Sequence, residues 1–391
     1  MKIGIAGAGI GGLAAAALLA RDGHDVAVFD QFDAPRAVGS GLVIQPVGRA
    51  VLDTAGAGDA ADLGAPIGRM LGHEAETGRV VLSVSYGRAP ERRGIGIHRA
   101  ALHAGLIDAA RDAGAELHAA HQISGRSGTE LHFDGQDSQT FDLIVDALGA
   151  GSLLSPLQAR PLSYGAVWAT VPWRDDGGLP DDQLSQRYRL ANRMVGVLPI
   201  GRMERDGRKL AAIFYSLPAG AEAKWRARDF SDWRAEVLAL WPEAAAFFPD
   251  TLRHDDFTFA RYTHGSLKRP WSDGIVHLGD AAHRASPQLG QGANMALLDA
   301  RALQLALRRG ATDDAYRRFA AARRWHVMAY QVMSAMFTPQ YQSDSTWLPV
   351  LRDRVLAPLS QVPPIPWVLT SLVCGDILPP MPALTPRRGG G

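Results

Sequence analysis

The sequence is almost without cysteine, and this scarcity excludes several ways of building a fold or a site. Cys374 is the one cysteine among 391 residues, so no disulfide can form within the chain and no cysteine-rich metal centre can be built. We therefore predict no metal site. Since chains that fold without disulfides are typical of reducing compartments, we also predict a cytoplasmic location.

A surplus of charge is lacking too. The 41 basic and 40 acidic residues leave a formal net charge of +1, which argues against nucleic acid or an acidic polymer as a partner. No uninterrupted apolar run reaches the roughly 18 residues that a membrane-spanning helix needs. Hydrophobic residues still make up 47% of the chain, enough for two or three packed regions at this length. The oligomeric state stays open.

The beginning of the chain, MKIGIAGAGIGGLAAAALLARD, imitates a signal peptide because a lysine precedes an apolar stretch. Its glycines would interrupt the apolar helix that a signal peptide needs. We instead predict a strand at 2–6, a glycine-rich turn, an alanine-rich helix at 13–21 and a second strand at 25–29 that leads to Asp30. This order predicts the start of a folded domain.

The turn has the spacing G-x-G-x-x-G at Gly7, Gly9 and Gly12, with Gly11 between the last two. In dinucleotide-binding folds the first glycine permits a tight turn, the second lets the backbone approach a pyrophosphate, and the third lets helix and strand pack closely. The helix start attracts phosphates, and Asp30 can accept hydrogen bonds from a ribose. The unit predicts a dinucleotide site, and the motif fits both NAD and FAD.

The character of the chain changes twice after this unit. Aromatic, strand-like runs such as YGAVWATVPW, MVGVLPIG and KLAAIFYSL predict an antiparallel sheet with one covered face, and GIVHLGD then returns to the style of the first strands. We predict an α/β fold in which an antiparallel-sheet domain interrupts a Rossmann-like domain and a helical region follows. The predicted ranges are 1–66, 89–159 and 263–310 for the Rossmann-like domain, 67–88 and 160–262 for the sheet domain, and 311–391 for the C-terminal helical region with its proline-rich tail.

Three ordered segments resemble the single-component FAD-dependent aromatic hydroxylases, the group of para-hydroxybenzoate hydroxylase and UbiH-like proteins. They are GAGIGG with Asp30, IHRAALHAGL at 97–106 and GDAAHRASPQLGQGANMALLDA at 279–300. The resemblance covers residues 1 to about 335, and the third segment is its most specific part. It implies that the Rossmann-like domain binds FAD and that the sheet domain binds the substrate.

The resemblance implies a role for individual residues. Asp280 would contact the sugar-phosphate chain of FAD, and the helix that starts near Ala293 would aim its N-terminus at the flavin. Arg99 would lie near the ribityl chain and Arg36 near the phosphates. The implied cofactor-binding residues are Gly7, Gly9, Gly11, Gly12, Asp30, Arg36, Arg99, Asp280, Gly290, Gln291, Gly292, Ala293 and Asn294, and the implied wall of the reaction site is Pro287 with Gly290.

Aromatic residues of the sheet domain are the candidates for a substrate pocket. Trp168, Tyr188 and Tyr215 lie on its strand-like runs, and plain sheet core is the alternative interpretation. His283 lies in the Gly-Asp loop, but we assign it no catalytic role. A residue that merely fills the loop is an equally good interpretation.

The chain departs from the family at one motif. Leu148 stands where the family has the aspartate of an Asp-Gly pair, and Gly149 follows it. That aspartate serves both FAD and NAD(P)H in the family, so its replacement leaves open how the flavin is reduced. Asp146 points the same way by strand alternation and is a candidate substitute.

The resemblance implies a monooxygenase. NADPH or NADH would reduce FAD, dioxygen would form a flavin C4a-hydroperoxide, and a small aromatic or heteroaromatic substrate would receive one oxygen atom. Two alternatives stay open: an FAD-dependent dehydrogenase or reductase without oxygen insertion, and a flavin-binding protein without turnover. The apolar, proline-rich tail allows shallow membrane contact, although a helical cap on the core is the simpler interpretation.

Overall fold

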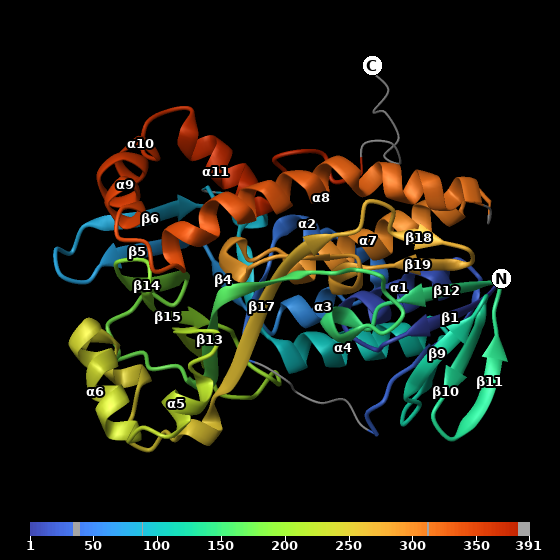
Figure 1. Cartoon of the computed structure of the whole chain (residues 1–391), viewed down its shortest axis with the longest axis horizontal. Helices are drawn as coiled ribbons and strands as arrows, with labels where there is room; N and C mark the ends of the chain where they lie inside the picture. Colours follow the sequence, from blue (N-terminus) through green and yellow to red (C-terminus); the bar gives the residue numbers. More distant parts are fainter. Residues whose placement is uncertain (34–39, 88, 311–312, 382–391) are drawn as a thin grey trace.

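The structure is a computed structural model that describes residues 1–33, 40–87, 89–310 and 313–381. Arg36, a predicted cofactor-binding residue, lies outside the described residues. Figure 1 shows a parallel sheet near the N-terminus beside a large, mostly antiparallel sheet. The long helix α8 (Asp313–Tyr341) runs along one edge of both.

The parallel sheet has the strand order β18-β19-β12-β1-β2-β8, and only β18 is antiparallel to its neighbour. Its strands are β1 (Lys2–Ala6), β2 (Asp25–Phe29), β8 (Glu116–His118), β12 (Leu143–Asp146), β18 (Trp271–Ser272) and β19 (Ile275–His277). The predicted return of the chain to this sheet after the insertion is confirmed, since β19 pairs with β12. Loops that follow parallel strands meet at one sheet edge, so the glycine turn, Asp30, Leu148 and Gly279 lie at the same edge.

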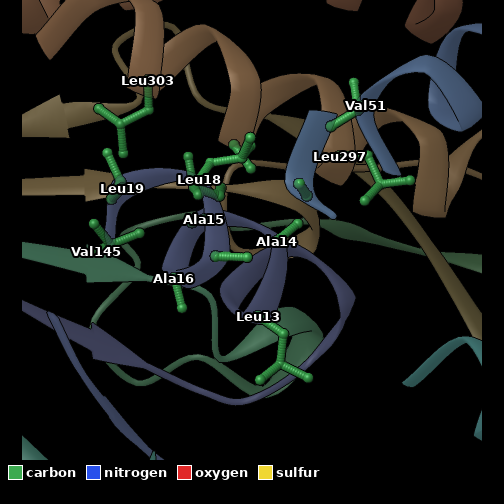
Figure 2. Close-up of a cluster of buried hydrophobic side chains, with 14 of the residues drawn as sticks. Leu13, Ala14, Ala15, Ala16, Leu18, Leu19, Val51, Val145, Leu297 and Leu303 are labelled. Carbon is green, nitrogen blue, oxygen red and sulfur yellow. The ribbon is translucent and has the colours of Figure 1, made fainter. Parts of the chain in front are cut away.

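Helices pack on this sheet around a common hydrophobic core that is rich in short side chains. They are α1 (Ile10–Arg21), α2 (Pro46–Ala55), α3 (Gly58–Ala61), α4 (Arg99–Asp112) and α7 (Gly292–Leu307). Figure 2 shows leucines and alanines of α1 and leucines of α7 in this core. Short side chains let the two helices approach so closely that a Cβ on Gly11 would lie 3.2 Å from that of Ala296.

Two small sheets flank the parallel sheet. One contains β3 (Gly41–Ile44), β7 (Gly94–His98) and β4 (Ala65–Ile67), and the other contains β9 (Ile123–Ser127), β10 (Glu130–Phe133) and β11 (Gln136–Thr140). The first of these small sheets lies between the parallel sheet and the large sheet and connects them. Just before β3, the Ser40 hydroxyl donates to the carbonyl oxygen of Ala169 at 3.0 Å, in the large sheet.

The large sheet has the strand order β20-β17-β13-β16-β15-β14-β5-β6. Its strands are β5 (Arg69–Glu74), β6 (Val80–Ser85), β13 (Arg160–Pro172), β14 (Gln183–Arg189), β15 (Arg193–Pro199), β16 (Leu210–Pro218), β17 (Thr258–Ser266) and β20 (His283–Arg284). All neighbours are antiparallel except β14 and β5. The early pair β5 and β6 joins the late strands, and β17 continues past the predicted boundary at residue 262.

Different elements cover the two faces of the large sheet. Its outer face packs on α5 (Glu222–Arg226), α6 (Phe230–Leu240) and the turn η3 (Pro242–Phe247), with Trp225, Trp233 and Trp241 in the interface. Its inner face packs on β3, α8 and the C-terminal helices. Because side chains alternate along a strand, neighbouring residues of one strand belong to different interfaces.

The C-terminal region is helical, as the sequence predicts. After α8 come α9 (Leu348–Leu351), the π-helical turn η7 (Arg352–Leu356), α10 (Ala357–Leu359) and α11 (Ile365–Cys374). The helix predicted from about 314 to 336 continues to Tyr341, with Pro339 inside it. Within the ranges that the structure describes, no helix has the length and apolar character needed to cross a membrane.

Candidate cofactor and substrate site

The glycine turn between β1 and α1 is closed by backbone on two sides. Gly7 has a φ of +101°, and a Cβ there would lie 2.6 Å from the carbonyl oxygen of Ala147. A Cβ on Gly12 would lie 2.0 Å from the carbonyl oxygen of Gly7. A Cβ on Gly9 would meet nothing within 4 Å. The turn is therefore tight at Gly7 and packed closely on α1 at Gly12. It is open beside Gly9, where the backbone of dinucleotide-binding folds approaches a pyrophosphate.

Asp30 braces this turn from the end of β2. Its Oδ2 accepts a hydrogen bond from the N–H of Ala8 at 2.8 Å, and its Oδ1 accepts one from the N–H of Phe32 at 3.1 Å. His103 of α4 lies 2.7 Å from the carbonyl oxygen of Ala8. Each carboxylate oxygen has a further lone pair, so Asp30 retains acceptor sites for a ribose. That contact stays a prediction.

Asp280 and Arg99 carry opposite charges at the same edge of the sheet. Asp280 lies in the turn η5 (Gly279–Ala281) after β19, and Arg99 begins α4 directly after β7. Both side chains reach solvent, yet burial raises the pKa of Asp280 and lowers the pKa of Arg99. Asp280 and Arg99 are thus solvent-accessible but poorly hydrated. Such charged groups suit a polar ligand, because the ligand can replace the remaining water.

A buried ionic cluster lies behind this turn, centred on Asp299 of α7. Asp299 Oδ2 accepts a hydrogen bond from the N–H of Gly279 at 2.9 Å and lies 2.7 Å from His283 Nε2, while Oδ1 accepts from Arg323 Nε at 2.7 Å. Burial raises the pKa of Asp299, but attraction and hydrogen bonds from His283 and Arg323 outweigh it and hold the pKa well below its ordinary value. His283 is thus a buried structural partner of Asp299.

The loop between β20 and α7 presents an exposed, glycine-rich edge. After the turn η6 (Pro287–Leu289), Gly290 has a φ of +61°, a left-handed conformation that favours glycine. Pro287 and Gly292 are exposed. The first N–H groups of α7, from Gly292 and Ala293 onward, have no intrahelical acceptor and carry the positive end of the helix dipole. This edge offers donors and open backbone to a flat, electron-rich group.

The polar side chains of the same loop point into the protein. Asn294 Oδ1 accepts from the N–H of Gln45 at 2.8 Å, and Asn294 Nδ2 donates to the carbonyl oxygens of Val43 and Gly290 at 3.1 and 3.0 Å. Gln291 Nε2 donates to two carbonyl oxygens of α11, at 3.3 and 2.9 Å. The side chains of Gln291 and Asn294 therefore brace the loop, and the cofactor contacts predicted for these two residues stay predictions.

Two buried polar atoms beside the loop have no hydrogen-bond partner in the protein. They are Gln45 Nε2 and Gln291 Oε1. A Cβ on Gly290 would lie 3.3 Å from Gln45 Nε2, so this unpaired donor lies against the edge of the loop. Leaving a buried donor or acceptor unpaired costs about 1–3 kcal/mol, and the pyrimidine ring of a flavin offers partners of both kinds. The residues of this site fit FAD.

The loop after β12 lies against the glycine turn but has no acid there. A Cβ on Gly7 would lie 3.0 Å from Cα of Leu148. Asp146 is fully buried, with Oδ2 at 2.7 Å from His277 Nδ1 and from the donating hydroxyl of Ser152, and with Oδ1 accepting from the N–H of Leu148. The interpretation of Asp146 as a substitute for the absent acid is wrong, because its carboxylate faces His277 inside the sheet.

The three aromatic candidates for a substrate wall divide between the two faces of the large sheet. Trp168 and Tyr188 lie on the inner face, where the ring of Tyr188 is 5.1 Å from that of Tyr341 in α8. Tyr215 packs on α6 and donates its hydroxyl to Glu236 at 2.9 Å. The prediction for Tyr215 is wrong, since strand alternation directs it to the outer face. Trp168 and Tyr188 stay candidates.

Tyr262 of β17 is a further inner-face residue that the sequence analysis did not single out. Trp168 Nε1 donates to its hydroxyl oxygen at 3.1 Å. Burial raises the pKa of Tyr262 to about 12, so the hydroxyl stays protonated near neutral pH. The alternation within TFARYTHGS was the available signal, but it could not show which face the cofactor domain covers.

Two surface clefts lie apart from the loop of residues 279–294. The larger, of about 390 Å³, is lined by residues that include Asp62, Trp173 and Lys209, and the smaller, of about 320 Å³, lies near Glu76 and Tyr215. Neither is lined by the loop of residues 279–294, so we assign neither to the cofactor. Among the residues that the structure describes, no group of three or more His, Cys, Asp or Glu side chains is arranged to hold a metal ion.

Two models of protein families match parts of the chain. The model of an NAD(P)-binding Rossmann-like domain matches residues 5–37, which contain the glycine turn and Asp30. The model of an FAD binding domain matches residues 195–329, which contain the loop of residues 279–294 and the cluster around Asp299. Both matches fall on the elements that form the site.

Curated proteins and solved structures are similar over most of the chain. A kynurenine 3-monooxygenase of Xanthomonas euvesicatoria pv. vesicatoria is 31% identical over 366 residues, covering 84% of this chain and 76% of that protein. A probable 2-heptyl-3-hydroxy-4(1H)-quinolone synthase of Rhodococcus erythropolis is 29% identical over 310 residues, covering 76% of this chain and 77% of that protein. The fold matches a variant of Klebsiella pneumoniae HpxO complexed with FAD, with a TM-score of 0.78 at 22% identity, over 97% of this chain and 100% of that one.

Proposed function

The chain belongs to the family of FAD-dependent aromatic hydroxylases, and from this membership we propose that it hydroxylates a small aromatic or heteroaromatic ring. One atom of dioxygen enters the ring, the other leaves as water, and NAD(P)H supplies the two electrons. The observation that carries the proposal is the loop of residues 279–294, which combines Asp280, an exposed Pro287 and the open start of α7 at one edge.

When bound, FAD supplies the oxygen-activating chemistry, and the protein supplies position and electrostatics. The glycine turn and Asp30 would hold the dinucleotide end of FAD. Arg99 and Asp280 would hold its ribityl and pyrophosphate part. Gly290 to Ala293 would hold the flavin ring through backbone groups, with Pro287 on the wall between the ring and the substrate.

The start of α7 supports this assignment electrostatically. A partly buried helix N-terminus stabilises nearby negative charge by up to about 2 kcal/mol, and a reduced flavin is negatively charged at its pyrimidine ring. The one carboxylate buried within α7, Asp299, is paired with Arg323 and His283. Its charge therefore does not cancel the positive field at the helix start.

The substrate class follows from chemistry and from the relatives. Attack on activated oxygen requires an electron-rich ring, such as a phenol, an aniline or a hydroxylated heterocycle. The names of two relatives mention kynurenine and a hydroxyquinolone, and we propose a ring of that size for this chain.

The test combines cofactor content, oxidation of NAD(P)H and product mass. We expect the purified protein to be yellow and to release FAD on denaturation. NADPH and NADH oxidation should accelerate with some members of a panel of phenols, anilines and hydroxyquinolines, with products that gain one oxygen atom. Oxidation without oxygen gain would favour the dehydrogenase or reductase alternative. A colourless protein that takes up no FAD would overturn the proposal.

We also propose a cytoplasmic location, where NAD(P)H is available. The C-terminal tail acts mainly as a helical cap, since two backbone carbonyl oxygens of α11 accept hydrogen bonds from Gln291. Gln291 lies in the loop of residues 279–294, here called the cofactor loop. The outer side of the tail exposes apolar residues, with Trp347 and Trp367 exposed by 64% and 72%. We assign no partner to that side.

A further inference from the structure

The inner side of α8 carries polar side chains at every fourth position. They are Tyr330, Ser334, Thr338 and Gln342, the last just beyond the helix end, and none is more than 7% exposed. Ser334 Oγ, Thr338 Oγ1 and Gln342 Oε1 have no hydrogen-bond partner in the protein. Since each unpaired buried polar atom is unfavourable, three on one side of a helix point to a ligand that pairs with them.

Hydrogen bonds from Gln331 and Gln342 show which way this polar row faces. Gln331 Nε2 donates to the carbonyl oxygen of Arg284 at 3.1 Å, on β20. Gln342 Nε2 donates to the hydroxyl of Ser216 at 3.0 Å and to the carbonyl oxygen of Gly165 at 3.4 Å. Gly165 pairs with the first half of β17, and β20 pairs with its last residues. The stretch of α8 between these bonds therefore lies over the middle of β17.

Tyr262 is the residue of that middle stretch that faces the same space. Its hydroxyl oxygen accepts from Trp168 Nε1 on the inner face of the sheet, and its own hydrogen remains to be donated. Phe337, next to Thr338, packs against two hydrophobic clusters, one that contains Tyr188 and Phe214 of the large sheet and one that contains Leu289 of the loop of residues 279–294. The unpaired hydroxyls of α8 thus lie between the sheet and the loop where the flavin would bind.

We propose that Ser334, Thr338 and Tyr262 form the substrate-recognition wall of this enzyme, and that it selects an uncharged oxo- or hydroxy-substituted heteroaromatic ring. A hydroxyl can donate and accept, so three of them can match a ring carbonyl and a ring N–H together. The inference rests on the proposed function, because it names the substrate class of that same site.

Two ionisable groups near the row, Arg352 and His264, add little net charge to it. Arg352 lies beyond its far end, with its guanidinium 5.2 Å from the ring of Tyr341, and Nε donates to Asp353 at 2.6 Å. Its Nη2 lacks a partner, but the Arg352–Asp353 pair has no net charge. Burial lowers the pKa of His264 on β17, which favours its neutral form. A buried carboxylate is unfavourable without an opposite charge, so the wall favours a neutral ligand.

The test uses the full-length, FAD-loaded protein and matched probes. The probes are 4-quinolone and 4-hydroxypyridine, each paired with its 2-carboxylate, and binding is followed by the change in flavin absorbance without NAD(P)H. We expect a neutral probe to bind at least about tenfold more tightly than its carboxylate. Thr338→Val and Ser334→Ala should each weaken that binding by about tenfold, as loss of one hydrogen bond predicts.

Thermal unfolding of the same variants separates recognition from a structural role. Thr338→Val replaces an unpaired buried hydroxyl by a methyl group of similar size, so the ligand-free variant should be as stable as the wild type or more stable. Thr370→Val is the matched control, because the Thr370 hydroxyl donates to the carbonyl oxygen of Ser85 at 2.7 Å. It should lower the melting temperature and leave probe binding unchanged.

The failures of the two proposals differ. A protein that retains FAD and oxidises NAD(P)H, but that binds neither neutral probe or prefers the carboxylates, overturns this inference alone. Unchanged probe binding in both Thr338→Val and Ser334→Ala overturns it as well. A protein that cannot retain FAD overturns the proposed function itself.

Discussion

Gly279 donates its main-chain N–H to Oδ2 of Asp299 at 2.9 Å, and this bond connects the turn that carries Asp280 to a buried ionic cluster. The cluster extends outward: Arg323 Nη1 donates to the carbonyl oxygen of Pro380, and His326 Nε2 lies 2.9 Å from that of Gly375. One carboxylate in α7 therefore holds together the cofactor turn, α8 and the C-terminal segment.

Replacement of this carboxylate should damage both stability and cofactor binding. Asp299→Asn leaves the Arg323 guanidinium without an opposite charge, and breaking a buried pair in this way costs about 3–5 kcal/mol. We expect FAD to dissociate more readily, because the Asp280 turn loses its support. Urea unfolding and titration of the apoprotein with FAD measure the two effects.

Asp314→Asn is the control for this variant. Asp314 pairs with Arg318 at the start of the same helix that carries Arg323, but its side chain is 66% exposed, and exposed pairs contribute about 0–1 kcal/mol. Equal effects of the two substitutions on unfolding would contradict the role assigned to the buried cluster.

His326 should make stability depend on pH. Burial lowers its pKa to about 4, against about 6.5 in an unfolded chain. The unfolded chain therefore binds the proton more readily between these values. The stabilising contribution is complete above about pH 6.5 and decreases toward pH 4 by at most about 1.4 kcal/mol per unit.

His326→Gln removes this titration and keeps a donor for Gly375. Between pH 7 and 5, the free energy of unfolding of the wild type should decrease by about 1–2 kcal/mol more than that of the variant. The measurement is urea unfolding at both pH values. An equal decrease in the two proteins would show that His326 does not carry the dependence.

Gly290→Ala should weaken FAD binding beyond its effect on the backbone. The left-handed conformation costs a residue with a Cβ about 1 kcal/mol, and the new Cβ would also lie 3.3 Å from Gln45 Nε2. Gly178→Ala has nearly the same φ, +71°, with nothing near its Cβ. Both variants should lose stability, but only Gly290→Ala should raise the dissociation constant of FAD.

We expect two conservative substitutions on opposite faces of the large sheet to have different effects, one on stability and one on KM. Tyr215→Phe removes the hydrogen bond to Glu236 on the outer face and should lower stability by about 1 kcal/mol without changing KM for the substrate. Trp168→Phe changes the inner face and should raise KM. A raised KM in Tyr215→Phe would restore Tyr215 as a pocket residue.

The sequence predicted the parallel sheet and its long interruption because strand, glycine turn and helix each have a local signal. The face of the large sheet on which Tyr215 lies was not predictable. Side chains alternate along the strand in the same way whichever face α6 covers. The role of Asp299 was hidden for a similar reason. Its partners Arg323 and Gly279 lie 24 and 20 residues away, and only the packing of α8 on α7 brings them together.

Leu148 shows the limit of motif comparison. Its backbone lies against the glycine turn, as the position of the family's aspartate implies, yet its side chain can neither accept nor donate a hydrogen bond. The buried Asp146 beside it serves His277 instead.

Incubation under ¹⁸O-labelled dioxygen, with NADPH and a ring that accelerates NADPH oxidation, tests the central claim most directly. The account predicts a product that carries one labelled oxygen atom on the ring, in amounts that follow the NADPH consumed. Unlabelled product, or NADPH oxidation that yields only hydrogen peroxide with every ring tested, would contradict hydroxylation by this protein.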